Sequence, residues 1–125
     1  MELVTLADVF RLADVVSLHT PLLPETVGLV TGAHLATMKS GATFINTAWG
    51  PIVRQTQMID VLARRPDLQA VLDVCDPEPP GADSLLYTLP NVVLTPHIAG
   101  SVGTECRRMG RYMVEELERY LSGAH

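Results

Sequence analysis

Four short, continuous apolar runs constrain the fold of this chain more than any other feature of its sequence. They are ADVVSLHTP (13–21), GATFINTA (41–48), LQAVLDV (68–74) and NVVLTPH (91–97). Each is rich in Val, Ile and Leu and lacks the alternation of a half-buried strand, so each predicts a strand covered on both faces. Helical patterns lie between the runs, and this alternation favours an α/β fold with a parallel sheet and right-handed crossovers.

Three short helices are predicted before the last strand. Thr5, a favourable N-cap residue, precedes one amphipathic segment, and Thr31 precedes a shorter one. The segment RQTQMIDVLARR (54–65) ends in two arginines, which suit the negative end of a helix dipole. The apolar positions expected on the inner faces of these helices are Leu6, Val9, Phe10, Ala13, Leu35, Met38, Met58, Ile59 and Leu62.

The longest predicted helix covers 101–123, where Gly123 is a natural stop. Its apolar residues recur at three- and four-residue spacing, and we expect this stripe to pack in the core. The stripe consists of Met109, Met113, Leu117, Tyr120 and Leu121. His34 and His125 are predicted to lie at the surface.

The composition excludes several classes of protein. With 47% hydrophobic and 18% charged residues, 125 residues match one ordinary domain of ~100–200 residues. No apolar run approaches the ~18 residues of a membrane span, and no signal-peptide pattern follows Met1. The net charge of −5 disfavours nucleic acid and anionic membranes as partners. Cys75 and Cys106 match no metal-ligand spacing, so we expect two reduced, mostly buried thiols, no metal site and a cytoplasmic protein.

Polar and ionisable residues stand where the four predicted strands end. In open α/β sheets, ligands gather at the carboxyl ends of the strands. We therefore predict that Asp73, Glu78 and His97 meet on one edge of the sheet. The full set at these strand ends is His19 with Pro21, Asn46 to Trp49, Asp73 with Glu78, and Thr95 to His97.

Four ordered motifs cover much of the chain: ADVVSLHTPLLPET, MKSGATFINTAWG, LDVCDPEP and NVVLTPHIAGS. Their order and spacing resemble those of the D-isomer-specific 2-hydroxyacid dehydrogenases, which include phosphoglycerate dehydrogenase, and the resemblance spans roughly residues 5–123. Enzymes of this family join a Rossmann-type NAD-binding domain to a substrate-binding domain. The resemblance implies that residues 1–125 form the C-terminal part of an NAD-binding domain, with a partial Rossmann-like parallel sheet flanked by helices.

The resemblance also implies roles for individual residues. His97 matches the acid/base of the family, which takes the hydroxyl proton as hydride leaves for NAD. Glu78 matches the glutamate that hydrogen-bonds this histidine and favours its protonated form. Taken singly, without the context of the motifs, these residues have structural interpretations. His97 would be a structural histidine, Glu78 a solvated loop acid and Asp73 a strand-end cap. The positions that match cofactor-binding residues are Asp73 and Gly100 at the nicotinamide, Thr47 and Ala48 along the cofactor, and His19 and Pro21 beside the adenosine half.

Trp49 departs from the family pattern N-x-[AS]-R-G, which has arginine at this position. In the family, that arginine grips the carboxylate of a 2-hydroxy or 2-oxo acid through two parallel, charge-assisted hydrogen bonds. An indole has one neutral N–H donor and no charge. Such bonds contribute ~1.5–3 kcal/mol each, so their loss predicts lost or altered activity. The alternative is a substrate without a carboxylate, for which an aromatic wall is useful.

A second departure is the lack of G-x-G-x-x-G and of the later acidic residue that binds the ribose. We therefore expect the chain to be a fragment or remnant of an NAD-dependent dehydrogenase without the substrate-binding domain. We expect the lone chain to be inactive and to bind NAD weakly or not at all. The resemblance to the family implies a 2-hydroxy or 2-oxo acid as the substrate. The alternative is a non-catalytic module that binds itself or a partner.

The strand order predicts self-association. In the Rossmann order 3-2-1-4-5-6, we assign ADVVSLH to the third strand and GATFINTA to the fourth, so that two missing strands would lie between them. Two open edges would then template pairing with another chain. We expect a homodimer that exchanges the N-terminal strand and helix or closes the edges with a continuous sheet. The competing monomeric solution places the first strand directly beside the second.

Overall fold

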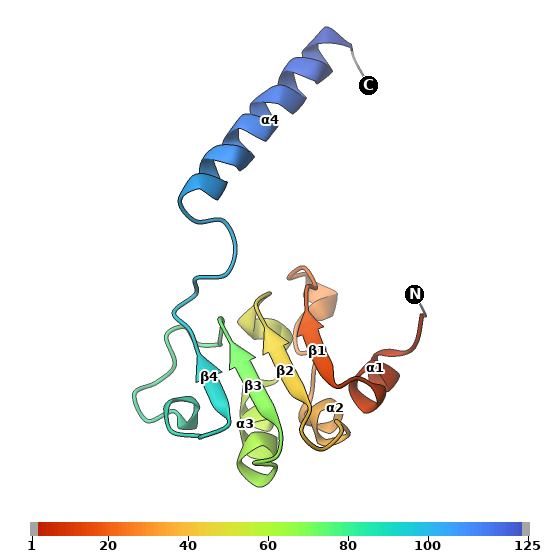
Figure 1. The fold of residues 1–125 in the computed structure, drawn as a ribbon, viewed down its shortest axis with the longest axis vertical. Helices are drawn as coiled ribbons and strands as arrows, with labels where there is room; N and C mark the ends of the chain where they lie inside the picture. The colour runs from red at the N-terminus through yellow and green to blue at the C-terminus, as the bar shows by residue number, and fades with distance from the viewer. Residues whose placement is uncertain (1–2, 124–125) are drawn as a thin grey trace.

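The computed structural model of the protein describes residues 3–123, which form a four-stranded parallel sheet, short helices packed against it and one long C-terminal helix (Figure 1). The strands are β1 (Val15–Leu18), β2 (Thr43–Asn46), β3 (Gln69–Leu72) and β4 (Val92–Leu94). The helices are α1 (Leu6–Leu12), α2 (Gly32–Ala36), α3 (Gln55–Arg64) and α4 (Thr104–Ser122), and the 3-10 turns are η1 (Pro24–Thr26), η2 (Gly50–Ile52) and η3 (Leu85–Tyr87). The α/β class and the parallel sheet are therefore confirmed, with strands shorter than the apolar runs.

Helix α1 begins as its sequence predicts. The Thr5 side chain accepts a hydrogen bond from the Asp8 backbone N–H, which satisfies one of the free donors of the first turn. Phe10 is fully buried, and its ring centroid lies 5.3 Å from that of His34. His34 is therefore half-buried rather than at the surface, and its Nδ1 accepts a hydrogen bond from the Thr31 backbone N–H at the start of α2. His125 lies outside the described residues.

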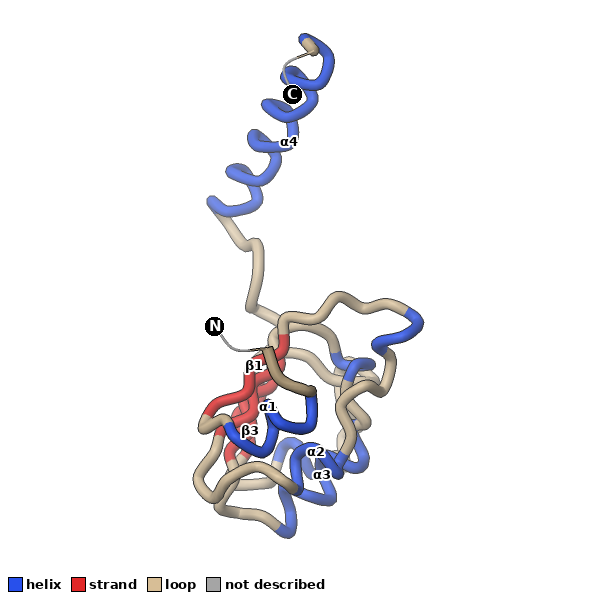
Figure 2. The backbone as a smooth tube through the Cα atoms, turned by 90° about the vertical axis from the view of Figure 1, so that its right-hand side faces the viewer, coloured by secondary structure: helices blue, strands red, loops and turns tan. Residues whose placement is uncertain are grey.

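Helices α1, α2 and α3 all lie on one face of the sheet (Figure 2). The crossovers β1 to β2 and β2 to β3 step in the same direction, and right-handed crossovers then place α2 and α3 on the same side. This face carries the core, in which Phe44 and Leu72 are about 1% exposed. None of the strand residues that point to the other face is buried; these are Val15, Ser17, Thr43, Ile45, Gln69, Val71 and Val93. The prediction that both faces are covered is therefore wrong for this chain.

The strand order is β1-β2-β3-β4, and it corrects the predicted topology. Val15 pairs with Thr43, and Leu18 pairs with Asn46, so β1 lies directly beside β2 without a gap. In the order 3-2-1-4-5-6, strands 3 and 4 are separated by strands 1 and 2, whereas the four strands here step across the sheet side by side in sequence order. Assigning β1 to the third position was therefore wrong, and the two inner open edges do not exist. The structure has the direct pairing that was the competing solution, so edge exchange no longer supports a dimer.

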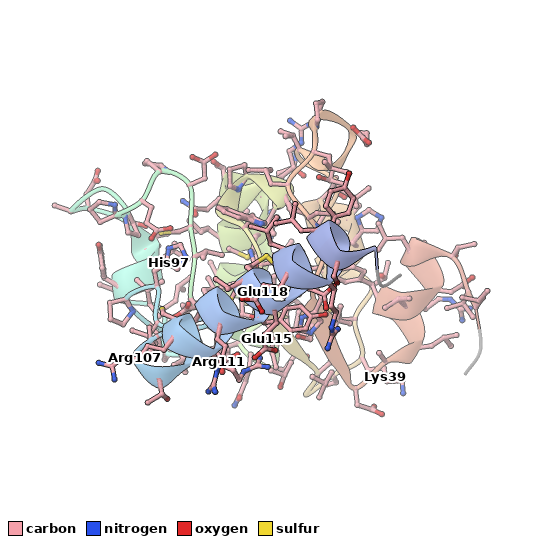
Figure 3. All side chains as sticks on the ribbon, turned by 90° about the horizontal axis from the view of Figure 1, so that it is seen from above. Lys39, His97, Arg107, Arg111, Glu115 and Glu118 are labelled. Atoms are coloured by element: carbon pink, nitrogen blue, oxygen red, sulfur yellow. The ribbon has the colours of Figure 1, made fainter. Side chains whose placement is uncertain are left out.

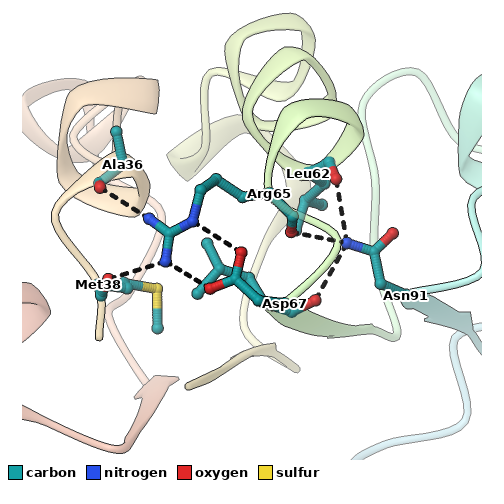
Figure 4. Close-up of polar contacts among 7 residues, drawn as sticks. Ala36, Met38, Leu62, Arg65, Asp67 and Asn91 are labelled. Atoms are coloured by element: carbon teal, nitrogen blue, oxygen red, sulfur yellow. Dashed lines mark hydrogen bonds and ion pairs between the residues drawn. The ribbon is translucent and has the colours of Figure 1, made fainter. Parts of the chain in front are cut away.

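Two polar side chains, those of Arg65 and Asn91, stabilise the end of the sheet at which strands β3 and β4 begin (Figure 4). The Arg65 guanidinium donates to the carbonyls of Ala36, the last residue of α2, and of Met38, just beyond it, and pairs with the Asp67 carboxylate at 2.7 Å. Asn91, just before β4, directs its amide nitrogen at three main-chain carbonyls, those of Leu62, Arg65 and Leu68, at 3.0–3.2 Å. Unsatisfied carbonyls at helix ends need such donors. These bonds hold the ends of α2 and α3 against the start of β4.

Helix α4 stands away from the sheet (Figure 1). It begins after Gly103 and ends at Gly123, whose left-handed φ of 74° suits the glycine predicted to stop it. None of its residues is buried, and Met113 is 59% exposed. The prediction that its apolar stripe packs in the core is therefore wrong, because the chain leaves the sheet after β4 and carries the helix away from the core.

Candidate active site at the carboxyl edge of the sheet

The carboxyl ends of all four strands lie at the edge from which the chain continues toward α4 (Figure 1). His19 follows β1 and donates to or accepts from the Ser17 hydroxyl at 3.0 Å. Asp73 directly follows β3, and His97 comes three residues after β4. The sheet therefore brings to one edge residues that lie far apart in the sequence, as predicted.

Asp73 is buried and acts as a clamp on the segment after β4. One carboxylate oxygen accepts hydrogen bonds from the Thr95 hydroxyl and the Ile98 backbone N–H, and the other accepts from the Ala99 backbone N–H at 2.8 Å. Burial alone would raise the pKa of Asp73, but these three bonds and the nearby His97 outweigh it and hold that pKa below its usual value. A charged, fully engaged Asp73 therefore fixes the backbone on the C-terminal side of His97.

His97 has a φ of 51°, the only positive φ of a non-glycine residue in 3–123. A left-handed backbone is uncommon for such a residue and persists only where the surroundings impose it. Here the hydrogen bonds of Asp73 to Ile98 and Ala99 impose it from one side, and the His97 N–H bond to the Thr95 carbonyl from the other. The strained backbone therefore lies at the candidate acid/base His97, and the hydrogen bonds of Asp73 maintain it.

Glu78 and His97 form a direct pair. Glu78 Oε1 and His97 Nδ1 lie 2.6 Å apart, which confirms the predicted proximity of these side chains. A carboxylate only accepts, so Nδ1 is the donor in this contact. That arrangement leaves Nε2 as the ring atom able to exchange a proton with a ligand.

The turn after β2 is shaped by the side chain of Asn46, which is 2% exposed. Its amide nitrogen donates to the Trp49 carbonyl at 3.1 Å, and its amide oxygen accepts from the Ala48 N–H at 3.0 Å. Trp49 is 47% exposed at the tip of this turn. The next residue, Gly50, lies so close to the neighbouring strand end that an added Cβ would stand 2.1 Å from the Cys75 carbonyl oxygen.

Two cavities meet at His97. One of about 400 Å³ is lined by His19, Thr20, Pro21, Thr47, Ala48, Trp49, His97 and Ala99. The other, of about 670 Å³, is more apolar and is lined by Asp73, Cys75, Glu78, Pro79, Pro80, Leu86, Tyr87, Val92, Leu94, Thr95, Pro96 and His97. None of the described residues around the first cavity is Arg or Lys. Trp49 and His97 therefore share a cavity whose walls from this chain hold no guanidinium or ammonium group.

The predicted cofactor residues are only partly brought together. His19, Pro21, Thr47 and Ala48 line the first cavity, whereas Asp73 lines the second and is occupied by hydrogen bonds within the chain. Gly100 lines neither, and its φ of 113° is one that side chains rarely adopt.

The cysteines differ from each other. Cys75 is buried as expected, and burial, with Glu78 and Asp76 nearby, raises the pKa of its thiol. Cys106 is exposed, so the expectation of two mostly buried thiols is wrong for it.

In the described part of the chain, no three His, Cys, Asp or Glu side chains gather as metal ligands. No helix within residues 3–123 is long and apolar enough to span a membrane.

Sequence reasoning missed two structural roles at this edge. Gly50 permits the close approach of the β2 turn to Cys75, and the sequence signal was a glycine just past a strand end. The backbone N–H groups of Ile98 and Ala99 receive the Asp73 carboxylate, and no side-chain pattern marks them.

Comparisons with known proteins identify the family to which the chain belongs. The family model described as D-isomer specific 2-hydroxyacid dehydrogenase, NAD binding domain, matches residues 1–99. A hydroxypyruvate reductase from Blautia hydrogenotrophica is 34% identical over 97% of this chain, and an (S)-sulfolactate dehydrogenase from Chromohalobacter salexigens is 41% identical over 93% of it. The chain spans 38% of the length of each of these two relatives.

A solved structure is similar over nearly the whole chain. It is the D-isomer specific 2-hydroxyacid dehydrogenase from Xanthobacter autotrophicus Py2, determined in complex with NADPH and MES. Its TM-score is 0.82 at 34% sequence identity, over 96% of this chain and 49% of that one.

Proposed function

Since this chain belongs to the D-isomer-specific 2-hydroxyacid dehydrogenase family through its NAD-binding domain, we propose that it forms the nicotinamide-facing half of such a domain. The corresponding reaction is hydride transfer between NAD(H) or NADP(H) and a 2-hydroxy or 2-oxo acid. The observation that carries the proposal is the Glu78–His97 pair at 2.6 Å, with His97 opening onto the cavity that Thr47, Ala48 and Trp49 line.

His97 has the arrangement of a general acid/base. Nδ1 of His97 is engaged by Glu78, so Nε2 accepts the hydroxyl proton of a 2-hydroxy acid while the carbon that bears this hydroxyl loses hydride. In the reverse direction Nε2 returns the proton to the oxygen of the 2-oxo acid. A nicotinamide cofactor, when bound, supplies the hydride acceptor or donor. Asp73 contributes by holding the backbone after His97, so that the imidazole keeps its position in both directions of the reaction.

The residues present fit only one end of such a cofactor. Thr47, Ala48 and Ala99 line a cavity of about 400 Å³ beside His97, which suits the nicotinamide end. No G-x-G-x-x-G occurs in the sequence, so the backbone cradle for the diphosphate is not supplied by these residues. We therefore expect NAD or NADP to bind the chain weakly, in the millimolar range near ~−4 kcal/mol.

Trp49 alters what this site can hold. The cavity contains no described Arg or Lys, so a substrate carboxylate has no bidentate, charge-assisted partner in this chain. The indole offers one neutral donor. We propose that the lone chain does not turn over 2-oxo acids for this reason and because the diphosphate cradle is lacking.

A titration followed by amide NMR tests the cofactor proposal. NADH and NADPH are added to the chain while the amide resonances of Thr47, Ala48 and Ala99 are recorded. We expect these resonances to shift with a millimolar dissociation constant, and resonances of α3 to stay in place as an internal control. Micromolar affinity would refute the weak-binding proposal, and shifts that spare these three residues would refute the assigned cavity.

The second candidate function is a non-catalytic module that associates with itself. The specific observation in its favour is α4, a helix of 19 residues of which none is buried.

A further inference from the structure

The cavity that Trp49 and His97 share is lined without a cation. None of the nine Lys and Arg residues, all within residues 3–123, lines this cavity or the larger one that also meets His97. Arg54, the arginine nearest to Trp49 in the sequence, packs its guanidinium against Gly28 and lines a separate cavity. No described arginine therefore takes the place of the one that the family pattern has at position 49.

The charged groups that do lie close to His97 are acids. Glu78 Oε1 is 2.6 Å from Nδ1 of His97, and the Asp73 carboxylate is near enough to interact electrostatically with the imidazole. Lys39, by contrast, lies well apart from His97 (Figure 3). A substrate carboxylate would approach two carboxylates without meeting a cation, and burying an unpaired charge is costly. The site therefore disfavours a carboxylate and suits an uncharged group.

The turn that carries Trp49 is fixed on both sides. The Asn46 amide donates to the Trp49 carbonyl at 3.1 Å and accepts from the Ala48 N–H at 3.0 Å. On the other side, Gly50 lies so close to the Cys75 carbonyl that no side chain fits between them. The direction in which the side chain at 49 leaves the backbone is therefore set by its neighbours, and Trp49 is a positioned wall of the cavity.

We propose that Trp49 determines specificity and that the site takes a neutral secondary alcohol, or the matching ketone, with an apolar group where a 2-hydroxy acid bears its carboxylate. The inference rests on the proposed function, because His97 still acts as the acid/base. The alcohol transfers its hydroxyl proton to Nε2 of His97 and its hydride to a bound nicotinamide cofactor, which leaves the ketone. An apolar group against the indole removes apolar surface from water and leaves no charge unpaired.

The test compares two probes that differ only at this group, by NMR on the whole chain. Mandelate carries a carboxylate where 1-phenylethanol carries a methyl group, and both are used as racemates. Trp49 is the only tryptophan, so its indole N–H resonance reports on the wall, and the amides of Ala48 and Ala99 report on the same cavity in the variants. The variants are Trp49→Arg, Trp49→Leu and the matched control Tyr112→Arg, which places the same charge at a similarly exposed aromatic residue of α4.

We expect the wild type, Trp49→Leu and Tyr112→Arg to bind 1-phenylethanol at least about tenfold more tightly than mandelate, and Trp49→Arg to prefer mandelate. Amide spectra that are unchanged away from the cavity show that each variant is folded. A wild type that binds both probes equally, or neither, overturns the inference. A preference that Trp49→Arg leaves unchanged, or that Trp49→Leu or Tyr112→Arg also reverses, overturns it as well, because the missing charge at position 49 would then not set the selectivity.

A titration with NADH separates this inference from the proposed function. If NADH shifts the amides of Thr47, Ala48 and Ala99 but the wild type does not discriminate between the probes, only the inference on Trp49 fails. If NADH leaves these amides in place, the assigned cavity is refuted and the inference fails with it.

Discussion

Replacing Asp73 with asparagine is expected to destabilise the chain by about 2 kcal/mol. The carboxylate accepts three hydrogen bonds, from the Thr95 hydroxyl and from the backbone N–H groups of Ile98 and Ala99. Hydrogen bonds to a charged group contribute ~1.5–3 kcal/mol each, but the 98–99 segment is exposed, so water replaces part of what is lost. The asparagine oxygen can keep the contacts at one carboxylate oxygen, whereas its NH2 group would face the Ala99 N–H, donor against donor.

Urea denaturation at neutral pH measures this loss. The matched control is Asp60→Asn, because Asp60 is exposed on α3 and makes no hydrogen bond within the described chain. We expect the control to stay within ~0.5 kcal/mol of the wild type. Equal free energies of unfolding for the Asp73 and Asp60 variants would refute the clamp.

The same substitution changes the pH dependence of stability. The pKa of Asp73 in the folded state lies below its unfolded value of 3.8, so its stabilising contribution is complete above that value and is lost as the pH falls through the folded pKa. The wild type should therefore lose more stability than Asp73→Asn between about pH 5 and about pH 3. Other carboxylates titrate in both proteins and cancel in the difference. Parallel acid profiles for the two proteins would contradict the lowered pKa.

Three further experiments test other contacts by chemical denaturation or thiol labelling. Asn91→Ala removes the donor to three main-chain carbonyls and should lower the free energy of unfolding by about 1–3 kcal/mol; an unchanged urea midpoint would contradict this. Gly50→Ala drives a methyl group against the Cys75 carbonyl and should cost at least about 1–3 kcal/mol, whereas Gly81→Ala, which meets only one flexible carboxylate, should be nearly neutral. In a Cys106→Ser background, burial should keep the Cys75 thiol from reacting with a thiol reagent except through opening of the fold, so fast labelling of folded protein would argue against that burial.

Much of the fold could be predicted from the sequence because buried strands leave continuous apolar runs. All four strands were located, and Thr5 and Gly123 marked helix ends by the donors or the backbone angle that those positions need. The apolar runs could not reveal that one face of the sheet is open, since a residue such as Val93 is apolar whether or not this chain covers it. For the same reason, the stripe of α4 predicted packing but not the location of its partner.

The site could be predicted in its side chains but less well in its backbone. Glu78 and His97 were expected together because strand ends meet at one edge, and they lie 2.6 Å apart. The left-handed φ of His97 and the grip of Asp73 on the backbone depend on main-chain N–H groups that every residue carries. The order of the strands was misassigned because each run fits more than one position of a Rossmann sheet, and pairing is decided only by the folded register.

The most direct test of the proposed function is the activity of a full-length relative whose matching segment is replaced by residues 3–99 of this chain. With Trp49 in place, we predict a kcat/KM for 2-oxo acids about 10²–10⁴ lower than with Trp49→Arg, the equivalent of two charge-assisted hydrogen bonds. His97→Asn in the arginine form should then abolish turnover, while NADH binding, measured separately, shows that each chimera is folded. Equal activity with Trp49 and arginine would contradict the role given to Trp49. A folded arginine form that binds NADH but is inactive would contradict the assignment of Glu78 and His97 as the acid/base pair.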